Sequence, residues 1–248
     1  MGEFKIAAAQ VASIRGELAR NLQTHAEAVT VAAARGVSVL VFPELSLTGY
    51  EPELAAAHAI AAGDARLDPL GELALRHRMH TVAGAPLSAD GPKPALGAIL
   101  FGPDGTRRTY AKIHLGGGEA NYFIPGSGPL AFDSHGQMVG LSICADSSAP
   151  SHPQSYAALG ATVYAAGVFL NAAWYATDTP RLADYATRHG MLVVMANHAA
   201  SVGTHVSVGR SAVWAPDGAL LAQAAGAENA LVVATRGPES WGAAVSVL

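Results

Sequence analysis

Hydrophobic residues occur along the chain in short runs that alternate with amphipathic stretches. Residues 17–34 carry apolar side chains, such as Leu18 and Leu22, at the three- and four-residue spacing of a helix. Residues 37–42, VSVLVF, form a continuous apolar run rich in β-branched residues, which is typical of a buried strand. The same two patterns recur to the end of the chain and predict an α/β protein.

Two tight turns add a second signature. The sequence PDG occurs at residues 103–105 and 216–218, each time between two predicted strands, and it indicates an antiparallel hairpin. The alternation of strands and helices places helices outside the sheets, so two mixed sheets packed face to face and covered by helices satisfy both signatures. Strands are predicted over residues 4–11, 37–42, 81–85, 96–101, 106–113, 137–143, 162–166, 192–196, 211–215, 220–224 and 230–235, and helices over residues 17–34, 68–80, 151–159 and 179–189.

No linker, repeat or low-complexity block interrupts this pattern, so we expect one domain over residues 1–248. Apolar residues make up 50% of the chain and charged residues 14%, which leaves apolar surface to cover. We therefore expect a homodimer or a higher homo-oligomer. The net charge is −4 and the only adjacent basic pair is at 107–108, so we expect no nucleic-acid partner.

The sequence predicts neither a secretory signal nor a membrane partner. Residues 1–7 show no basic leader ahead of an apolar stretch. Polar residues interrupt the most apolar window, residues 157–174, which falls short of the ~20 apolar residues that a membrane span needs. The single cysteine, Cys144, cannot form an internal disulfide, and we expect a cytoplasmic location.

Three chemically useful side chains lie near the ends of separate predicted strands: Glu44, Lys112 and Cys144. A carboxylate at the mouth of an apolar strand is poorly solvated, and the resulting rise in its pKa suits a general base. A lysine can stabilise an oxyanion or hold a neighbouring thiol as thiolate. Taken alone, each residue has an ordinary interpretation: a surface glutamate, an edge-strand lysine and a core cysteine. Together, if the strand ends converge, they predict a nucleophilic site that cleaves amides.

The segments around these residues resemble the nitrilase superfamily of carbon–nitrogen hydrolases. They are FPELSLTGY at 42–50, KIHL at 112–115 and LSICAD at 141–146, and the resemblance extends from residues 8–10 to residues 210–218. It implies a four-layer αββα sandwich that usually dimerises through a helical layer. It also implies that Glu44 is the general base, that Lys112 stabilises the tetrahedral intermediate, and that Cys144 is the nucleophile, with no metal or organic cofactor.

The resemblance implies two supporting groups. The backbone N–H of Ala145 would help to bind the oxyanion. Glu119, which precedes FIPG at 123–126, would orient Lys112 and the substrate; the alternative is a solvated loop residue beside three glycines.

Three further residues follow strand ends and are expected at the rim of the pocket. They are Tyr50, Asn171 and Trp174. Asn171 can alternatively cap a turn, and Trp174 can alternatively belong to the core. Asp146 is expected to have a structural role, either shaping the turn after Cys144 or capping the helix that follows.

The stretch after Cys144 departs from the family. Many members carry an arginine, an aromatic residue and an acid where this chain has Ser148, Ala149 and Ser151, while Pro150 remains. A specific anionic substrate is therefore in doubt. The small side chains imply a roomier pocket wall, or another group that fills it.

The leading hypothesis is a hydrolase that cleaves a small amide through a cysteine thioester, of the amidase, ω-amidase or N-carbamoyl hydrolase type; nitrile hydrolysis ranks lower. The alternative is a catalytically silent binding or regulatory protein with the same fold. Alkylation separates the two, since an activated thiolate reacts well below the ~8.5 pKa of a free cysteine. A metal-dependent hydrolase is the weakest hypothesis, because His77 and His80 share a helical face but lack a third ligand.

Overall fold

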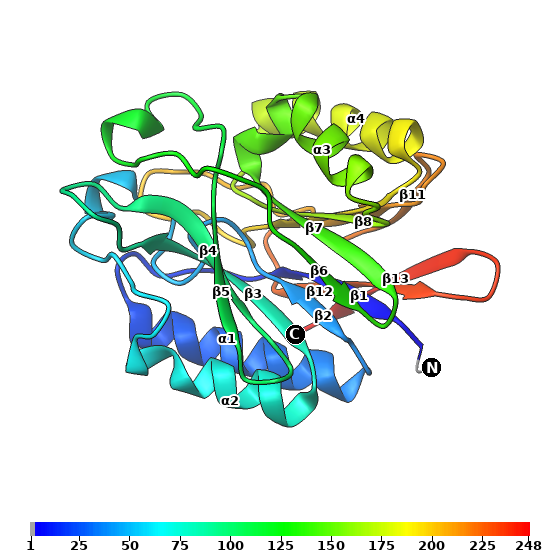
Figure 1. Cartoon of the computed structure of the whole chain (residues 1–248), viewed down its shortest axis with the longest axis horizontal. Helices are drawn as coiled ribbons and strands as arrows, with labels where there is room; N and C mark the ends of the chain where they lie inside the picture. Colours follow the sequence, from blue (N-terminus) through cyan, green and yellow to red (C-terminus); the bar gives the residue numbers. More distant parts are fainter. Residues whose placement is uncertain (1–2) are drawn as a thin grey trace.

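Four layers make up the fold. The computed structural model describes residues 3–248, and in that part of the chain a seven-stranded and a six-stranded sheet pack face to face. Helices α1 (Leu18–Ala34) and α2 (Asp68–His77) cover the outer face of the larger sheet, and α3 (Ser151–Ala158) and α4 (Ala172–His189) cover that of the smaller one (Figure 1). The αββα sandwich expected from the sequence is confirmed.

Both sheets mix parallel and antiparallel pairs. Each sheet contains three neighbouring parallel strands, and both PDG turns join antiparallel strands, the first turn in the larger sheet and the second in the smaller. In spatial order the larger sheet contains β13 (Trp241–Val247), β12 (Ala230–Arg236), β1 (Lys5–Gln10), β2 (Val39–Val41), β3 (His80–Leu87), β4 (Ala95–Phe101) and β5 (Arg107–Ala111). The smaller sheet contains β11 (Leu220–Gln223), β10 (Ala212–Trp214), β9 (Leu192–Asn197), β8 (Val163–Val168), β7 (Gln137–Ile143) and β6 (Ala131–Ser134). The helices are α1 (Leu18–Ala34), α2 (Asp68–His77), α3 (Ser151–Ala158) and α4 (Ala172–His189).

Several boundaries differ from the sequence prediction. Strands β6 and β13 were not predicted, because β6 has four residues and β13, although mostly apolar, is a largely exposed edge strand interrupted by a glycine and a serine. Helix α4 begins at Ala172 instead of residue 179 and continues through Pro180. Helix α2 ends earlier than predicted, because Arg78 adopts a left-handed conformation with φ of 51°, and His80 begins β3.

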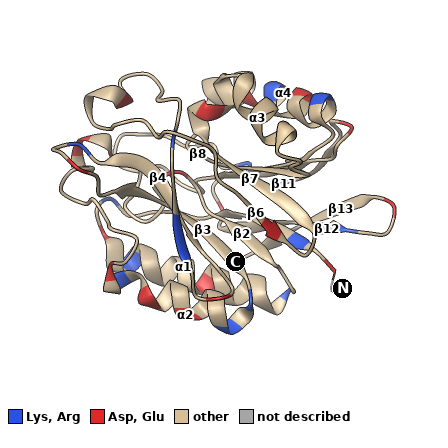
Figure 2. Cartoon of the chain, in the orientation of Figure 1, with Lys and Arg blue, Asp and Glu red and all other residues tan. Residues whose placement is uncertain are grey.

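The space between the sheets is filled by aliphatic side chains from both, among them Val41, Leu141 and Val194. Charged positions lie on the outer helices α1, α2 and α4 (Figure 2). Among residues 3–248, no helix is both long enough and apolar enough to cross a membrane.

Two glycines, one from each sheet, flank the turn that follows β2. A β-carbon on Gly84 of β3 would lie 2.5 Å from the backbone nitrogen of Leu45 and 3.0 Å from the carbonyl carbon of Glu44. A β-carbon on Gly167 of β8 would lie 2.6 Å from the carbonyl oxygen of Phe42. The turn that carries Glu44 can therefore enter the sandwich only because both neighbours lack a side chain.

We predict that Gly84→Ala displaces this turn and lowers the free energy of unfolding by about 1–3 kcal/mol, as overpacking typically does. Chemical denaturation measures the change. Gly63→Ala is the matched control, because a β-carbon there meets no atom within 4 Å. Equal stability of the two variants would contradict the close approach.

Candidate active site

Glu44, Lys112 and Cys144 converge from three separate segments. Glu44 lies in the turn after β2, Lys112 is the residue after β5, and Cys144 follows β7 as the first residue of the 3-10 turn Cys144–Ser148. The backbone of Lys112 is fixed on both sides, because its N–H donates to the carbonyl of Leu96 and its carbonyl accepts from Gly126, each at 2.8 Å.

The ammonium of Lys112 is fully buried between two carboxylates. Its Nζ lies 2.8 Å from Oε1 of Glu44 and 2.8 Å from both carboxylate oxygens of Glu119. Burial by itself lowers the pKa of Lys112, but attraction to Glu44, to Cys144 as thiolate and to Glu119 outweighs it, and the pKa is raised. Lys112 is therefore a permanent cation, and the cluster carries one net negative charge when Glu44 is ionised.

Glu44 is poised to exchange a proton near neutral pH. Burial raises its pKa to about 7, opposed by Lys112 and assisted by the negative charge of Glu119. Only Oε1 has a hydrogen-bond partner among residues 3–248, so Oε2 is free to take a proton. Nε2 of the buried His198 donates to the backbone carbonyl of Glu44 at 2.7 Å and fixes the turn from the other sheet.

Cys144 has an unusual backbone. Its φ of 43° lies in the left-handed region, which is strained for any residue with a β-carbon. The side chain is half-buried. Burial raises the pKa of the thiol well above its usual range, and Glu44 raises it further, whereas Lys112 lowers it. The direction of this shift favours the protonated thiol at rest.

This protonation state changes two expectations from the sequence. Of the two roles expected of Lys112, the raised pKa of the thiol favours oxyanion stabilisation over holding a resting thiolate. The thiol instead loses its proton to a base as it reacts. Measured turnover therefore separates an enzyme from a silent relative more directly than the rate of alkylation does.

Glu119 is buried, so the alternative interpretation of it as a solvated loop residue is wrong. It begins the 3-10 turn Glu119–Asn121. Besides contacting Lys112, its Oε2 accepts from the backbone N–H of Gly116 at 2.6 Å, and its Oε1 accepts from the hydroxyl of Tyr50 at 3.1 Å. These contacts fix Glu119 and, through it, the ammonium.

A pocket of about 270 Å³ opens over these residues. Its walls include Cys144, Ala145, Tyr50 and Trp174. Ala145 is the second residue of a 3-10 turn, where the N–H has no partner inside the turn. Trp174 is 49% exposed, so it is not a core residue.

Asn171 is not among the residues that line this pocket, which corrects its placement at the rim. Its side chain caps α4 by accepting from the backbone N–H of Trp174 at 2.9 Å. The capping alternative is the one that the structure supports, because the first N–H groups of a helix require acceptors from outside it.

Asp146 joins the lysine segment to the cysteine segment, a role that the sequence did not indicate. Its Oδ1 accepts from the N–H groups of Ile113 and His114, and its Oδ2 from the N–H of Ile143 and the hydroxyl of Tyr110, all within 2.6–3.0 Å. The side chain is fully buried. One carboxylate therefore fixes the positions of Lys112 and Cys144 relative to each other.

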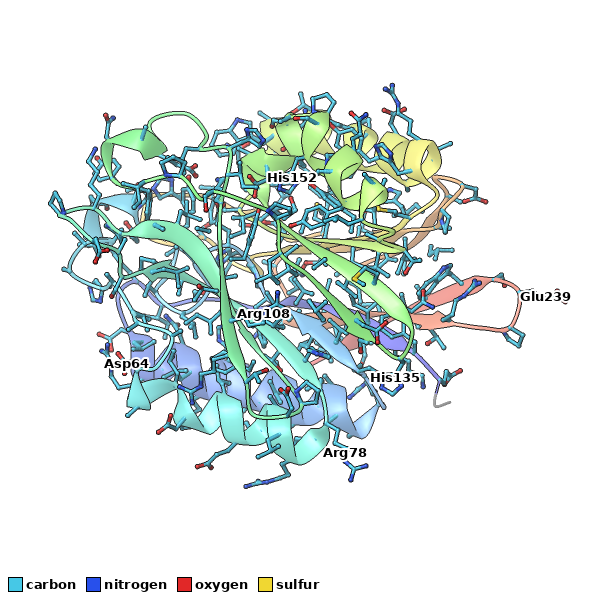
Figure 3. All side chains as sticks on the ribbon, in the orientation of Figure 1. Asp64, Arg78, Arg108, His135, His152 and Glu239 are labelled. Atoms are coloured by element: carbon cyan, nitrogen blue, oxygen red, sulfur yellow. The ribbon has the colours of Figure 1, made fainter. Side chains whose placement is uncertain are left out.

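Tyr110 extends this network into the helical layer. Its hydroxyl also contacts Nε2 of His152 at 2.8 Å, and Nδ1 of His152 lies 2.8 Å from the hydroxyl of Tyr164. His152 belongs to α3 and is labelled in Figure 3. The turn after β7 is thus anchored from both sides of its sheet.

The two histidines considered as metal ligands lie on different elements. His77 ends α2, and His80 begins β3 and packs against Phe132 with ring centroids 4.6 Å apart. In the described part of the chain, no three or more His, Cys, Asp or Glu side chains are grouped to hold a metal ion.

Comparison with known families agrees with the fold and with the position of Cys144. The model of the carbon–nitrogen hydrolase family matches residues 5–244. The chain belongs to this family, which is the one expected from the segments around Glu44, Lys112 and Cys144.

Solved structures of an amidase of the nitrilase superfamily from Nesterenkonia sp. AN1 are similar to this chain. One, showing Michael addition of acrylamide at the active-site cysteine, has a TM-score of 0.84 and 27% identity over 93% of this chain and 92% of the amidase. Another, in complex with butyramide, has a TM-score of 0.85 and 27% identity over 94% and 90% of the two chains. Cys144 lies in a position like that of the amidase's active-site cysteine.

Two curated relatives are also similar. A glutamine-dependent NAD(+) synthetase from Thermotoga maritima is 31% identical over 169 residues, which are 66% of this chain and 29% of that protein. A nitrilase from Pyrococcus abyssi is 32% identical over 152 residues, which are 59% of this chain and 57% of that protein. The matches thus span less than two thirds of the length of either relative.

We predict that Asp146→Asn lowers the free energy of unfolding by about 2–4 kcal/mol, because an amide cannot accept all four hydrogen bonds and leaves buried donors unpaired. Thermal or chemical denaturation measures the loss. Asp133→Asn is the control, since Asp133 is exposed and accepts one long hydrogen bond, from Gly136 at 3.3 Å. An Asp146→Asn variant as stable as this control would show that the carboxylate does not join the segments.

Proposed function

We propose that the protein hydrolyses small amides through a thioester on Cys144. The observation that carries the proposal is the buried contact between Lys112 and Glu44 at 2.8 Å, beside a cysteine in the same pocket. The cluster supplies a base, a fixed cation and a nucleophile, which are the groups that acyl transfer requires.

In the first step the sulfur of Cys144 bonds to the carbonyl carbon of the amide while the thiol proton passes to Glu44. The carbonyl oxygen becomes an oxyanion, for which Lys112 and the backbone N–H of Ala145 are the donors. Nζ of Lys112 is initially held by both carboxylates. Protonation of Glu44 removes one of those negative charges and frees an N–H for the oxyanion, so base action and oxyanion stabilisation are coupled.

The second half of the reaction uses the same proton carrier. Glu44 gives its proton to the leaving nitrogen as the C–N bond breaks, which releases ammonia from a primary amide and leaves the thioester. A water then attacks the thioester and gives its proton to Glu44. The thiolate of Cys144 leaves and recovers that proton, so the acid is released and the resting site is restored. A pKa of about 7 suits a group that must accept and return a proton in each half.

The amidase relatives support an amide as substrate. The Nesterenkonia enzyme is described with acrylamide and butyramide, both small primary amides. The pocket of about 270 Å³ suits a metabolite-sized amide. We therefore propose an amidase, ω-amidase or N-carbamoyl hydrolase, and rank nitrile hydrolysis below them.

We predict that the purified protein releases ammonia from members of a panel of small amides, and that Cys144→Ala lowers kcat by a factor on the order of 10³ or more. Mass spectrometry of the wild type should show a thioester on Cys144, whose added mass gives the acyl group. Ser151→Ala, an exposed position at the start of α3, is the control and keeps full activity. A Cys144→Ala variant as active as the wild type would refute the proposed nucleophile.

We predict that kcat/KM rises with pH through about 7, the value to which burial raises the pKa of Glu44. The sign follows from its role: Glu44 must be ionised to accept the thiol proton, so activity is low below this value and reaches a plateau above it. Steady-state ammonia release across the pH range measures the profile. A rate that is constant between about pH 5.5 and 8.5 is inconsistent with this assignment.

A further inference from the structure

Helix α4 forms the outer wall of the pocket and presents two chemically distinct side chains to it. Trp174 and Asp178 are four residues apart, so they are neighbours on one face of the helix. Both line the pocket, together with Ser148. The catalytic mechanism uses neither of them, which raises the question of what they bind.

Asp178 is largely buried and forms an ion pair with Arg181 that engages only one of its two carboxylate oxygens. Its side chain is 15% exposed, and Oδ1 accepts from Nη2 of Arg181 at 2.6 Å and from the hydroxyl of Thr177 at 3.2 Å. Among the residues that the structure describes, no group donates a hydrogen bond to Oδ2. Arg181 thus holds the carboxylate in place and leaves one oxygen available to a ligand.

The remaining charges of the pocket disfavour an anion. Lys112 is the one cation among its lining residues within 3–248, and that ammonium is already held by Glu44 and Glu119. Arg181 is not among the lining residues, and its Nη2 is shared between Asp178 and the hydroxyl of Ser148 at 3.2 Å. A negatively charged ligand would therefore have to compete for Lys112 or Arg181 with the carboxylates that already pair with them.

Trp174 adds the second recognition element. Its side chain is half exposed at the pocket, and the face of an indole ring attracts a cation that lies over it. A carboxylate and an indole one helical turn apart form a site that suits an ammonium group.

We propose that this outer part of the pocket selects amides whose far end carries a protonated amine, held between the carboxylate of Asp178 and the ring of Trp174. The inference rests on the proposed amide hydrolysis and specifies its substrate class. The scissile amide lies at Cys144, and the ammonium group lies against α4.

Three amides with the same four-methylene chain test the proposal: 5-aminopentanamide, hexanamide and the monoamide of adipic acid. They end in ammonium, methyl and carboxylate groups, respectively. We expect kcat/KM for 5-aminopentanamide to exceed that for hexanamide by about tenfold, as one ion pair with a cation–π contact provides, and the adipic monoamide to be the poorest substrate. Asp178→Asn should remove most of this preference.

The control variant is Asp184→Asn. Asp184 lies on the same helix and pairs with Arg188 at 2.7 Å, but it does not line the pocket, so both activity and preference should be unchanged. Equal or better hydrolysis of hexanamide or the adipic monoamide would overturn the ammonium proposal while leaving amide hydrolysis intact. A preference that survives Asp178→Asn would overturn it equally.

Binding to the Cys144→Ala variant tests the same point without turnover. Calorimetry should give a dissociation constant for 5-aminopentanamide about tenfold lower than for hexanamide, and Asp178→Asn in this background should bring the two together. Tighter binding of the adipic monoamide would overturn the proposal. Failure of the wild type to hydrolyse any amide would count against the proposed function alone, since this binding comparison does not depend on chemistry.

Discussion

The buried ammonium of Lys112 is the constraint on which the site depends. An ionised lysine without water or a partner costs several kcal/mol, so the fold must deliver negative charge to it from more than one side. Glu44 arrives on the turn after β2 and Glu119 on the loop after β5, each at 2.8 Å. With both carboxylates ionised, the group of Glu44, Glu119 and Lys112 carries one net negative charge. Burial and this negative charge raise the pKa of the Cys144 thiol and so favour its protonated form.

The sandwich supplies this arrangement through close backbone approaches and one further buried carboxylate. Gly84 and Gly167, one on each sheet, admit the Glu44 turn between them. Asp146 then connects the lysine and cysteine segments through four hydrogen bonds. The reacting groups therefore sit on turns whose backbones are held by buried hydrogen bonds and by packing against both sheets, which limits reorganisation during the reaction.

Apolar runs and turn signals were sufficient to predict the layers and most strands, because buried strands and PDG hairpins are encoded locally. The meeting of Glu44, Lys112 and Cys144 was expected from the resemblance of the segments around them to the nitrilase superfamily, whereas their positions after strands left it conditional. Other features depend on tertiary context. Asp146 accepts hydrogen bonds from Tyr110, Ile113 and His114, which lie more than thirty residues earlier in the chain, so no local pattern indicates its role. The edge strand β13 is held by its pairing with β12, and the raised pKa of the Cys144 thiol follows from burial that no local pattern reports.

The left-handed backbone of Cys144 has a thermodynamic consequence. Glycine adopts this conformation without a steric penalty, whereas a residue with a β-carbon gives up of the order of 1 kcal/mol to hold it. The chain would thus gain stability from glycine at the one position where glycine would remove the sulfur. The backbone conformation that holds the reactive sulfur therefore lowers the stability of the fold. The buried hydrogen bonds and packing around Cys144 contribute the free energy that keeps this strained conformation populated.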